Sequence, residues 1–179
     1  MQWRGEAASL GWANIFDTLF CEVHGLWSER TNLAKKLPKL DLSDLGRSPG
    51  FPNLTPAKGQ SLAEAAAVCL KNRRHQPGKR LKVFGTQNVE YGLEWPMATN
   101  QMERTHNDLQ DATEDGACAV ALSLSFKMKG LTFIERSWKG PGFDYWIGKV
   151  AGGIFQNKTR LEVSGILKGE ESEIQGRIK

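Results

Sequence analysis

The spacing of apolar residues divides the first half of the chain into helical and irregular segments. Residues 1 to about 35 carry apolar side chains mostly three or four positions apart, which predicts one or two amphipathic helices. Residues 37–59 are rich in Pro, Gly, Ser and Asp, so we expect a connector with little regular structure. The stretch "SLAEAAAVCL" (61–70) begins with Ser61 and has Glu64 three residues later. This pattern predicts a helix that starts with a capping box.

The rest of the chain combines short strands with one long helix. "RLKVFG" and "VEYGLEW" each favour a strand. Residues 100–126 predict one long helix with a break near Gly116, and "LTFIERS", "GFDYWIG" and "RLEVSGIL" predict three strands. "EESEIQGRIK" indicates the start of a helix, without a signal for its end at Lys179, so a continuation of the natural chain stays open.

These elements suggest two parts. Residues 1–98 form a mainly helical N-terminal extension that includes a helix–strand–strand unit, and residues 99–179 form a core with the order helix, strand, strand, strand, helix. The length of 179 residues and the 40% hydrophobic content suffice for one core with an extension. The fold class expected is α/β.

Composition indicates where in the cell the protein is expected. The mean hydropathy is −0.44, and no apolar run approaches the roughly 20 residues of a membrane span. We therefore expect a cytoplasmic protein with no membrane partner.

The three cysteines are odd in number and widely spaced, which argues against a disulfide framework or a zinc site. Cys69 and Cys118 are expected to be buried apolar residues, and His106 is expected at the surface.

A basic run indicates where a nucleic acid would bind. The net charge of +4 permits such a partner without requiring it. Residues 71–82, "KNRRHQPGKRLK", hold six basic residues and no acid, which suits contact with phosphates. A solvated loop between a helix and a strand is the alternative. The candidate phosphate-contacting residues, including one from a basic turn before Asp144, are Lys71, Arg73, Arg74, Lys79, Arg80, Lys82 and Lys139.

Three carboxylates fall on successive elements of the predicted core. The long helix brings Glu114, the second strand Asp144 and the third strand Glu162. If they converge, they need a cation between them, and oxygen ligands of this kind suit Mg²⁺ or Mn²⁺. Such an ion polarises phosphoryl oxygens and activates water. Taken singly, each acid also has a plain structural role: Glu114 as a solvated residue, Asp144 as a turn cap, and Glu162 as an ion-pair partner of Arg160 or Arg136.

The order helix-Glu, strand-Asp, strand-Glu resembles the PD-(D/E)XK nucleases. The resemblance implies the restriction-endonuclease-like fold, a central mixed sheet flanked by helices. "ATEDGACAVAL" is similar to the first core helix, "GFDYWIG" to the strand with the family's Asp, and "RLEVSG" to the strand of the third motif. The resemblance covers about residues 100–179. It implies a metal-dependent endonuclease that hydrolyses DNA phosphodiester bonds, with Glu114, Asp144 and Glu162 as metal ligands, often in defence against foreign DNA such as phage.

The chain departs from the family at one position, because Ser164 stands where the motif has lysine. Three explanations stay open. Lys149 or Lys158 replaces the lysine from the intervening sequence, the enzyme works with Ser164 alone, or the site is inactive. In the last case the chain is a non-catalytic nuclease-like fold that binds nucleic acid or serves as a subunit of a larger complex. A protein partner or a homo-oligomer stays open as well.

Overall fold

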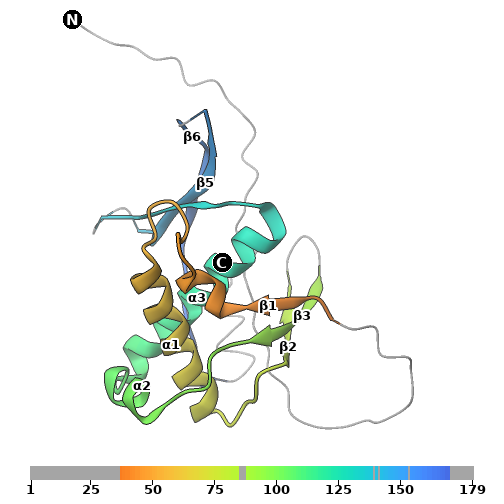
Figure 1. Cartoon of the computed structure of the whole chain (residues 1–179), viewed down its shortest axis with the longest axis vertical. Helices are drawn as coiled ribbons and strands as arrows, with labels where there is room; N and C mark the ends of the chain where they lie inside the picture. The colour runs from red at the N-terminus through yellow and green to blue at the C-terminus, as the bar shows by residue number, and fades with distance from the viewer. Residues whose placement is uncertain (1–36, 85–87, 139, 141, 153, 170–179) are drawn as a thin grey trace, which may run out of the picture.

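The computed structural model describes residues 37–169 except 85–87, 139, 141 and 153. The helices predicted for residues 1–35, the helix predicted from Glu170 and the side chain of Lys139 lie outside the described residues. The described part is an α/β structure of helices and two small sheets (Figure 1).

The strands form two three-stranded sheets. The two strands predicted within residues 1–98 belong to one sheet, and the three predicted within residues 99–179 belong to the other. In the first sheet, β3 (Val89–Glu94) lies between β1 (Lys39–Asp41), which is parallel to it, and β2 (Lys79–Val83), which is antiparallel. The second sheet is an antiparallel meander of β4 (Phe133–Arg136), β5 (Tyr145–Ala151) and β6 (Ile154–Leu161). Figure 1 shows β5 and β6 well apart from the β1–β3–β2 sheet.

The predicted connector 37–59 is more ordered than expected. It contains β1, the 3₁₀ helix η1 (Leu42–Gly46) and the first turn of α1 (Pro56–Asn72). The helix begins at Thr55 and not at Ser61, because the Thr55 hydroxyl accepts a hydrogen bond from the Lys58 N–H and Pro56 suits the first helical position. Four leucines of this segment are buried, which the Pro, Gly and Ser around them obscured in the sequence: Leu40, Leu42, Leu45 and Leu54.

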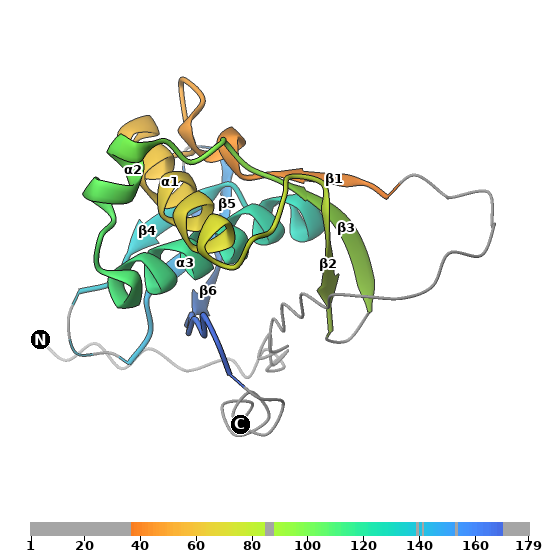
Figure 2. The same cartoon turned by 90° about the horizontal axis from the view of Figure 1, so that it is seen from below.

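The predicted long helix is two helices, α2 (Asn100–Thr105) and α3 (Leu109–Lys129), and it does not break at Gly116. The break falls earlier because the Asp108 carboxylate accepts hydrogen bonds from the Gln110 and Asp111 N–H groups and so starts α3. Gly116 lies inside α3 for packing reasons: a Cβ there would meet the Ala66 Cα at 3.0 Å. Helices α1 and α3 therefore pack closely together (Figure 2).

β5 and β6 form a tight hairpin whose boundaries differ from those that the sequence predicts. Ala151 pairs with Ile154, which leaves the two residues of a Gly-Gly sequence between the strands, and Gly152 has φ of 60°. β6 therefore occupies residues 154–161 and ends before Glu162. The third strand predicted at "RLEVSGIL" is thus wrong in its boundaries.

One hydrophobic cluster joins the described elements. It includes Leu40 and Leu42 near β1, Leu62 of α1, Leu122 of α3 and Ile147 of β5. A smaller cluster joins Ala65, Cys69 and Ala112, with Leu167 packed on it. Cys69 and Cys118 are buried free thiols, as predicted. The domain boundary predicted near residue 98 stays a prediction.

Candidate functional site

The two strand acids lie at adjoining ends of paired strands. Tyr145 of β5 pairs with Leu161 of β6. Neither acid lies within a strand, where the sequence predicts both: Asp144 immediately precedes β5 and Glu162 immediately follows β6. The Asp144 N–H donates to the Leu161 carbonyl at 2.9 Å, so the two segments are still joined at this point.

Asp144 is held from three directions. Its Oδ2 accepts a 2.8 Å hydrogen bond from the Val163 N–H, and its Oδ1 lies 3.7 Å from the Arg136 guanidinium. Its backbone carbonyl accepts from the Ser137 N–H at 2.9 Å. The side chain retains 28% of its exposure. The carboxylate is therefore fixed in position and still reaches solvent. These contacts explain how an acid is accommodated after Phe143 in this apolar run.

A buried polar group lies beneath Asp144. Cys118 of α3 and Tyr145 of β5 are both buried, and the Arg136 guanidinium lies 4.8 Å from the centre of the Tyr145 ring. Burial raises the pKa of the Cys118 thiol to about 11 and that of Tyr145 to about 12. Both groups stay protonated at neutral pH, so Cys118 is not an activated nucleophile.

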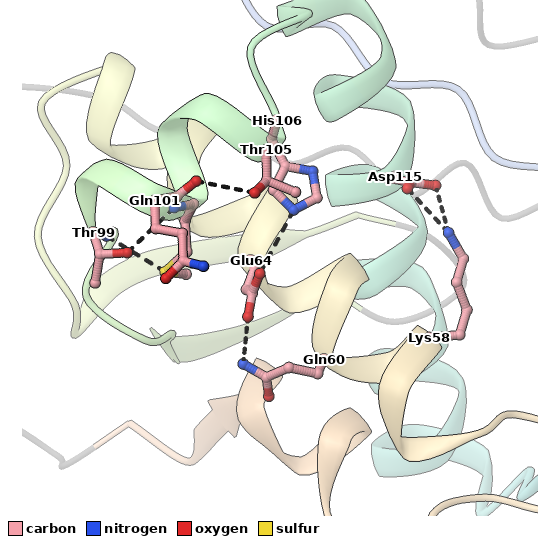
Figure 3. Close-up of polar contacts among 9 residues, drawn as sticks. Lys58, Gln60, Glu64, Thr99, Gln101, Thr105, His106 and Asp115 are labelled. Atoms are coloured by element: carbon pink, nitrogen blue, oxygen red, sulfur yellow. Dashed lines mark hydrogen bonds and ion pairs between the residues drawn. The ribbon is translucent and has the colours of Figure 1, made fainter.

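Glu114 and Glu162 are exposed. Glu114 lies one helical turn before Cys118, which puts it on the side of α3 that faces the Tyr145 group. Its neighbour Asp115 is paired with Lys58 of α1 at 3.0 Å (Figure 3). Within the described ranges, no group of three or more His, Cys, Asp or Glu side chains is placed to hold a metal ion.

The chain after β6 crosses the two main helices. Gly165 lies so close to α3 that a Cβ would meet the Thr113 carbonyl oxygen at 2.6 Å, and Leu167 packs on the cluster of Ala65, Cys69 and Ala112. Ser164, which replaces the motif lysine, is exposed between these anchored residues. Its backbone position is thereby set by its neighbours on both sides.

Neither candidate substitute lysine is brought to Asp144. Lys149 lies five residues farther along β5, a separation of about 16 Å along a strand, and its side chain passes near Gly130 at the end of α3. Lys158 lies in β6, and its ammonium group is 4.0 Å from Glu135 and 5.0 Å from the centre of the Trp146 ring. The cation that does lie beside Asp144 is Arg136, which the sequence suggests only as a partner of Glu162.

The basic run 71–82 is spread over three elements. Lys71 lies in the last turn of α1 and is paired with Glu103 at 2.6 Å, whereas Arg80 of β2 is paired with Glu90 at 3.6 Å. Arg73 and Arg74 follow α1 and are exposed. Lys79 and Lys82 lie in β2 and are half-buried. The exposed charge of this run is therefore concentrated at the end of α1.

His106 is not the surface residue that the sequence predicts. Its side chain is only 10% exposed, and its Nε2 lies 3.8 Å from the Glu64 carboxylate (Figure 3). The reason is the turn between α2 and α3, which folds the histidine back onto α1. It lies in the wall of an open hollow that Lys71, Glu103 and Leu109 also line.

Comparison with known proteins gives no assignment: no family model, no curated protein and no solved structure matches the chain. No helix in the described part of the chain is long and apolar enough to span a membrane.

Proposed function

We propose that this protein is a metal-dependent nuclease whose core is the unit α3–β4–β5–β6. The observation that carries the proposal is the pairing of Tyr145 with Leu161, because it brings Asp144 and Glu162 to neighbouring strand ends. The order helix, strand, strand, strand is the order on which the resemblance to the restriction-endonuclease-like fold rests. A role in defence against foreign DNA belongs to the same proposal.

The donor set suits a hard divalent cation such as Mg²⁺ or Mn²⁺. Asp144 offers a carboxylate whose position the Val163 N–H fixes, Glu162 follows the neighbouring strand, and Glu114 on α3 is a further exposed carboxylate. These three residues would hold the ion after their carboxylates move together, because the described conformation does not group them. When bound, such an ion supplies Lewis-acid polarisation of a phosphoryl oxygen and a more acidic water.

The other residues of the site have assignable roles. Arg136 provides a permanent positive charge beside Asp144, which suits stabilisation of charge that develops on a phosphate. The Ser164 hydroxyl, on a backbone anchored by Val163 and Gly165, is able to orient a water by hydrogen bonding. On this account Arg136 takes over the electrostatic part of the missing lysine's role, and neither Lys149 nor Lys158 is required.

Metal binding tests the proposal before any assay of activity. Mn²⁺ bound to the full chain is measured by electron paramagnetic resonance, with Asp144→Asn and Glu162→Gln as the test variants. Asp115→Asn is the matched control, because it removes an acid of α3 that is paired with Lys58. We expect both test variants to weaken Mn²⁺ binding by at least about tenfold and the control to bind as wild type. Equal Mn²⁺ binding by all four proteins would reject the site.

A second candidate function is non-catalytic binding of nucleic acid on a nuclease-like fold. The observation that favours it is that both oxygens of Asp144 already have protein partners, the Val163 N–H and Arg136. A carboxylate with such partners is stable without a metal. This candidate predicts that Asp144→Asn changes stability and leaves both Mn²⁺ uptake and DNA affinity unchanged.

A further inference from the structure

The face of the β4–β5–β6 sheet that points away from the core is both aromatic and basic. In β5 the buried residues Tyr145 and Ile147 alternate with Trp146, so Trp146 points to the opposite face. Trp146 pairs across the sheet with Glu135 on one side and Arg160 on the other. The half-buried aromatic and exposed basic residues of this outer face are Phe133, Phe143, Trp146, Phe155, Lys158 and Arg160.

These side chains form a continuous set of ring and cation contacts. The Phe133 and Phe155 rings are stacked with their centres 3.8 Å apart, and Phe143 meets Trp146 edge-on at 4.6 Å. The Lys158 ammonium lies 4.8 Å from the centre of the Phe155 ring, and the Arg160 guanidinium 5.5 Å from that of Phe143. The cations are thus held close to the rings, as in cation–π contacts.

Two basic residues of the other sheet are paired with acids. There Arg80 is paired with Glu90 at 3.6 Å and Lys39 with Glu94 at 3.4 Å. On the β4–β5–β6 face Lys158 has only a 4.0 Å contact with Glu135, and among the described residues no carboxylate lies within ion-pair distance of Arg160. Basic groups beside partly exposed rings are therefore a particular feature of this second sheet.

We infer that the outer face of the β4–β5–β6 sheet binds single-stranded nucleic acid. Unpaired bases stack on aromatic rings and guanidinium planes, and neighbouring Lys and Arg side chains contact the phosphates. A base pair in a duplex does not expose its faces in this way, so a duplex is excluded from the stacking contacts. The inference rests on the outer face alone and holds whether or not Asp144 binds a metal.

The experiment measures binding of a dye-labelled oligo-dT of roughly 16 nucleotides by fluorescence anisotropy. It is done in EDTA with the full chain, so that failure of the proposed metal site does not affect the result. We expect Trp146→Ala to weaken binding by roughly 5- to 150-fold and Trp146→Phe, which keeps a stacking ring, by less than about threefold. A duplex of the same length is expected to bind more weakly than the single strand.

Charge removal provides the matched comparison. Lys158→Gln combined with Arg160→Gln is expected to lower the salt slope of binding by about 1.4, since each cation on a single strand contributes about 0.7. Lys127→Gln combined with Lys129→Gln makes the same charge change in the exposed last turn of α3 and should leave the slope within error of wild type.

Quenching of tryptophan fluorescence by the oligonucleotide provides a readout that does not depend on a destabilised variant. The part of the quenching that disappears in Trp146→Phe reports stacking on this ring. The inference is overturned if no quenching is lost, if both charge pairs lower the slope equally, or if the duplex binds as tightly as the single strand. It is also overturned if the wild type does not bind oligo-dT. If Trp146→Ala then converts a self-associated chain to a monomer, the face is an interface between copies of the chain.

Discussion

The Val163 N–H donates a 2.8 Å hydrogen bond to the Asp144 carboxylate, and this contact ties the chain after β6 to the start of β5. It fixes the position of the segment 162–167 where this segment leaves the sheet and crosses α3. It also gives Asp144 a structural role that exists before any metal or substrate binds.

Removing this contact should lower stability by a predictable amount. Asp144→Ala leaves the Val163 N–H without its partner and Arg136 without its counter-charge, so we expect a loss of about 1–3 kcal/mol in the free energy of unfolding. Asp144→Asn keeps an oxygen acceptor for Val163 and should lose about 1 kcal/mol or less. Urea denaturation of both variants measures the difference. Equal losses of stability in the two variants would mean that the hydrogen bond to Val163 contributes nothing and that only the charge of Asp144 matters.

The buried Cys118 and Tyr145 should make the protein less stable in alkali. Burial raises the pKa of Cys118 from 9.0 to about 11 and that of Tyr145 from 10.0 to about 12. The unfolded chain therefore loses these protons first, and stability falls as the pH rises through the range from about 9 to 12. Each of these two changes in pKa corresponds to on the order of 2–3 kcal/mol.

Tyr145→Phe isolates one of these groups. It removes the titrating hydroxyl and keeps the ring beneath Arg136, so the decline in stability between about pH 10 and 12 should become shallower. Thermal denaturation at a series of pH values measures it. An unchanged slope for Tyr145→Phe would show that the hydroxyl titrates alike in the folded and unfolded chains.

Gly59 should be irreplaceable although it lies within a helix. A Cβ at this position would fall 1.9 Å from the Leu45 carbonyl oxygen, so Gly59→Ala must push η1 away from α1. We expect Gly59→Ala to lower the free energy of unfolding by roughly 1–3 kcal/mol or more. The same substitution at an exposed glycine within a helix would raise it by about 1 kcal/mol. Gly92→Ala is the control, since an added methyl group there would have no atom within 4 Å. A stabilised Gly59→Ala would contradict the close packing of η1 on α1.

Arg73 and Arg74 test whether the basic run contacts nucleic acid. Both are exposed at the end of α1, whereas Arg80 is paired with Glu90. Arg73→Glu combined with Arg74→Glu should weaken binding and reduce its salt dependence more than Arg80→Glu does. Anisotropy titrations at several salt concentrations measure both quantities. If affinity and salt slope stay those of wild type, the run is a solvated loop.

The sequence was informative where local chemistry decides structure. The strands β2, β3 and β4 and the body of α1 lie where alternation and alanine content placed them. Errors arose where one side chain overrides a pattern: Asp108 starts α3, and Thr55 with Pro56 starts α1. The division into two sheets depends on pairings distant in sequence, such as β1 with β3, which no local pattern encodes.

The candidate site was predictable only in part. The acids Asp144 and Glu162 were conspicuous because they interrupt apolar runs. Arg136 was not, because a basic residue at a strand end is common, and its importance comes from the pairing of β4 with β5. The alternation in "GFDYWIG" and "IFQNKTRL" indicates an outer face around Trp146. Which residues of the two strands share that face can be deduced only when the pairing of β5 with β6 is known.

Cleavage of DNA by the wild-type chain with Mg²⁺ or Mn²⁺ tests the central proposal most directly. The assay follows plasmid and linear DNA with wild type, Asp144→Asn, Lys149→Met, Lys158→Met and Ser164→Lys. Our account predicts metal-dependent cleavage by wild type, near loss of activity in Asp144→Asn, and activity close to wild type in both Met variants. A wild type that cleaves nothing with any metal, together with a Ser164→Lys variant that does, would contradict it and identify a binding protein with a disabled site.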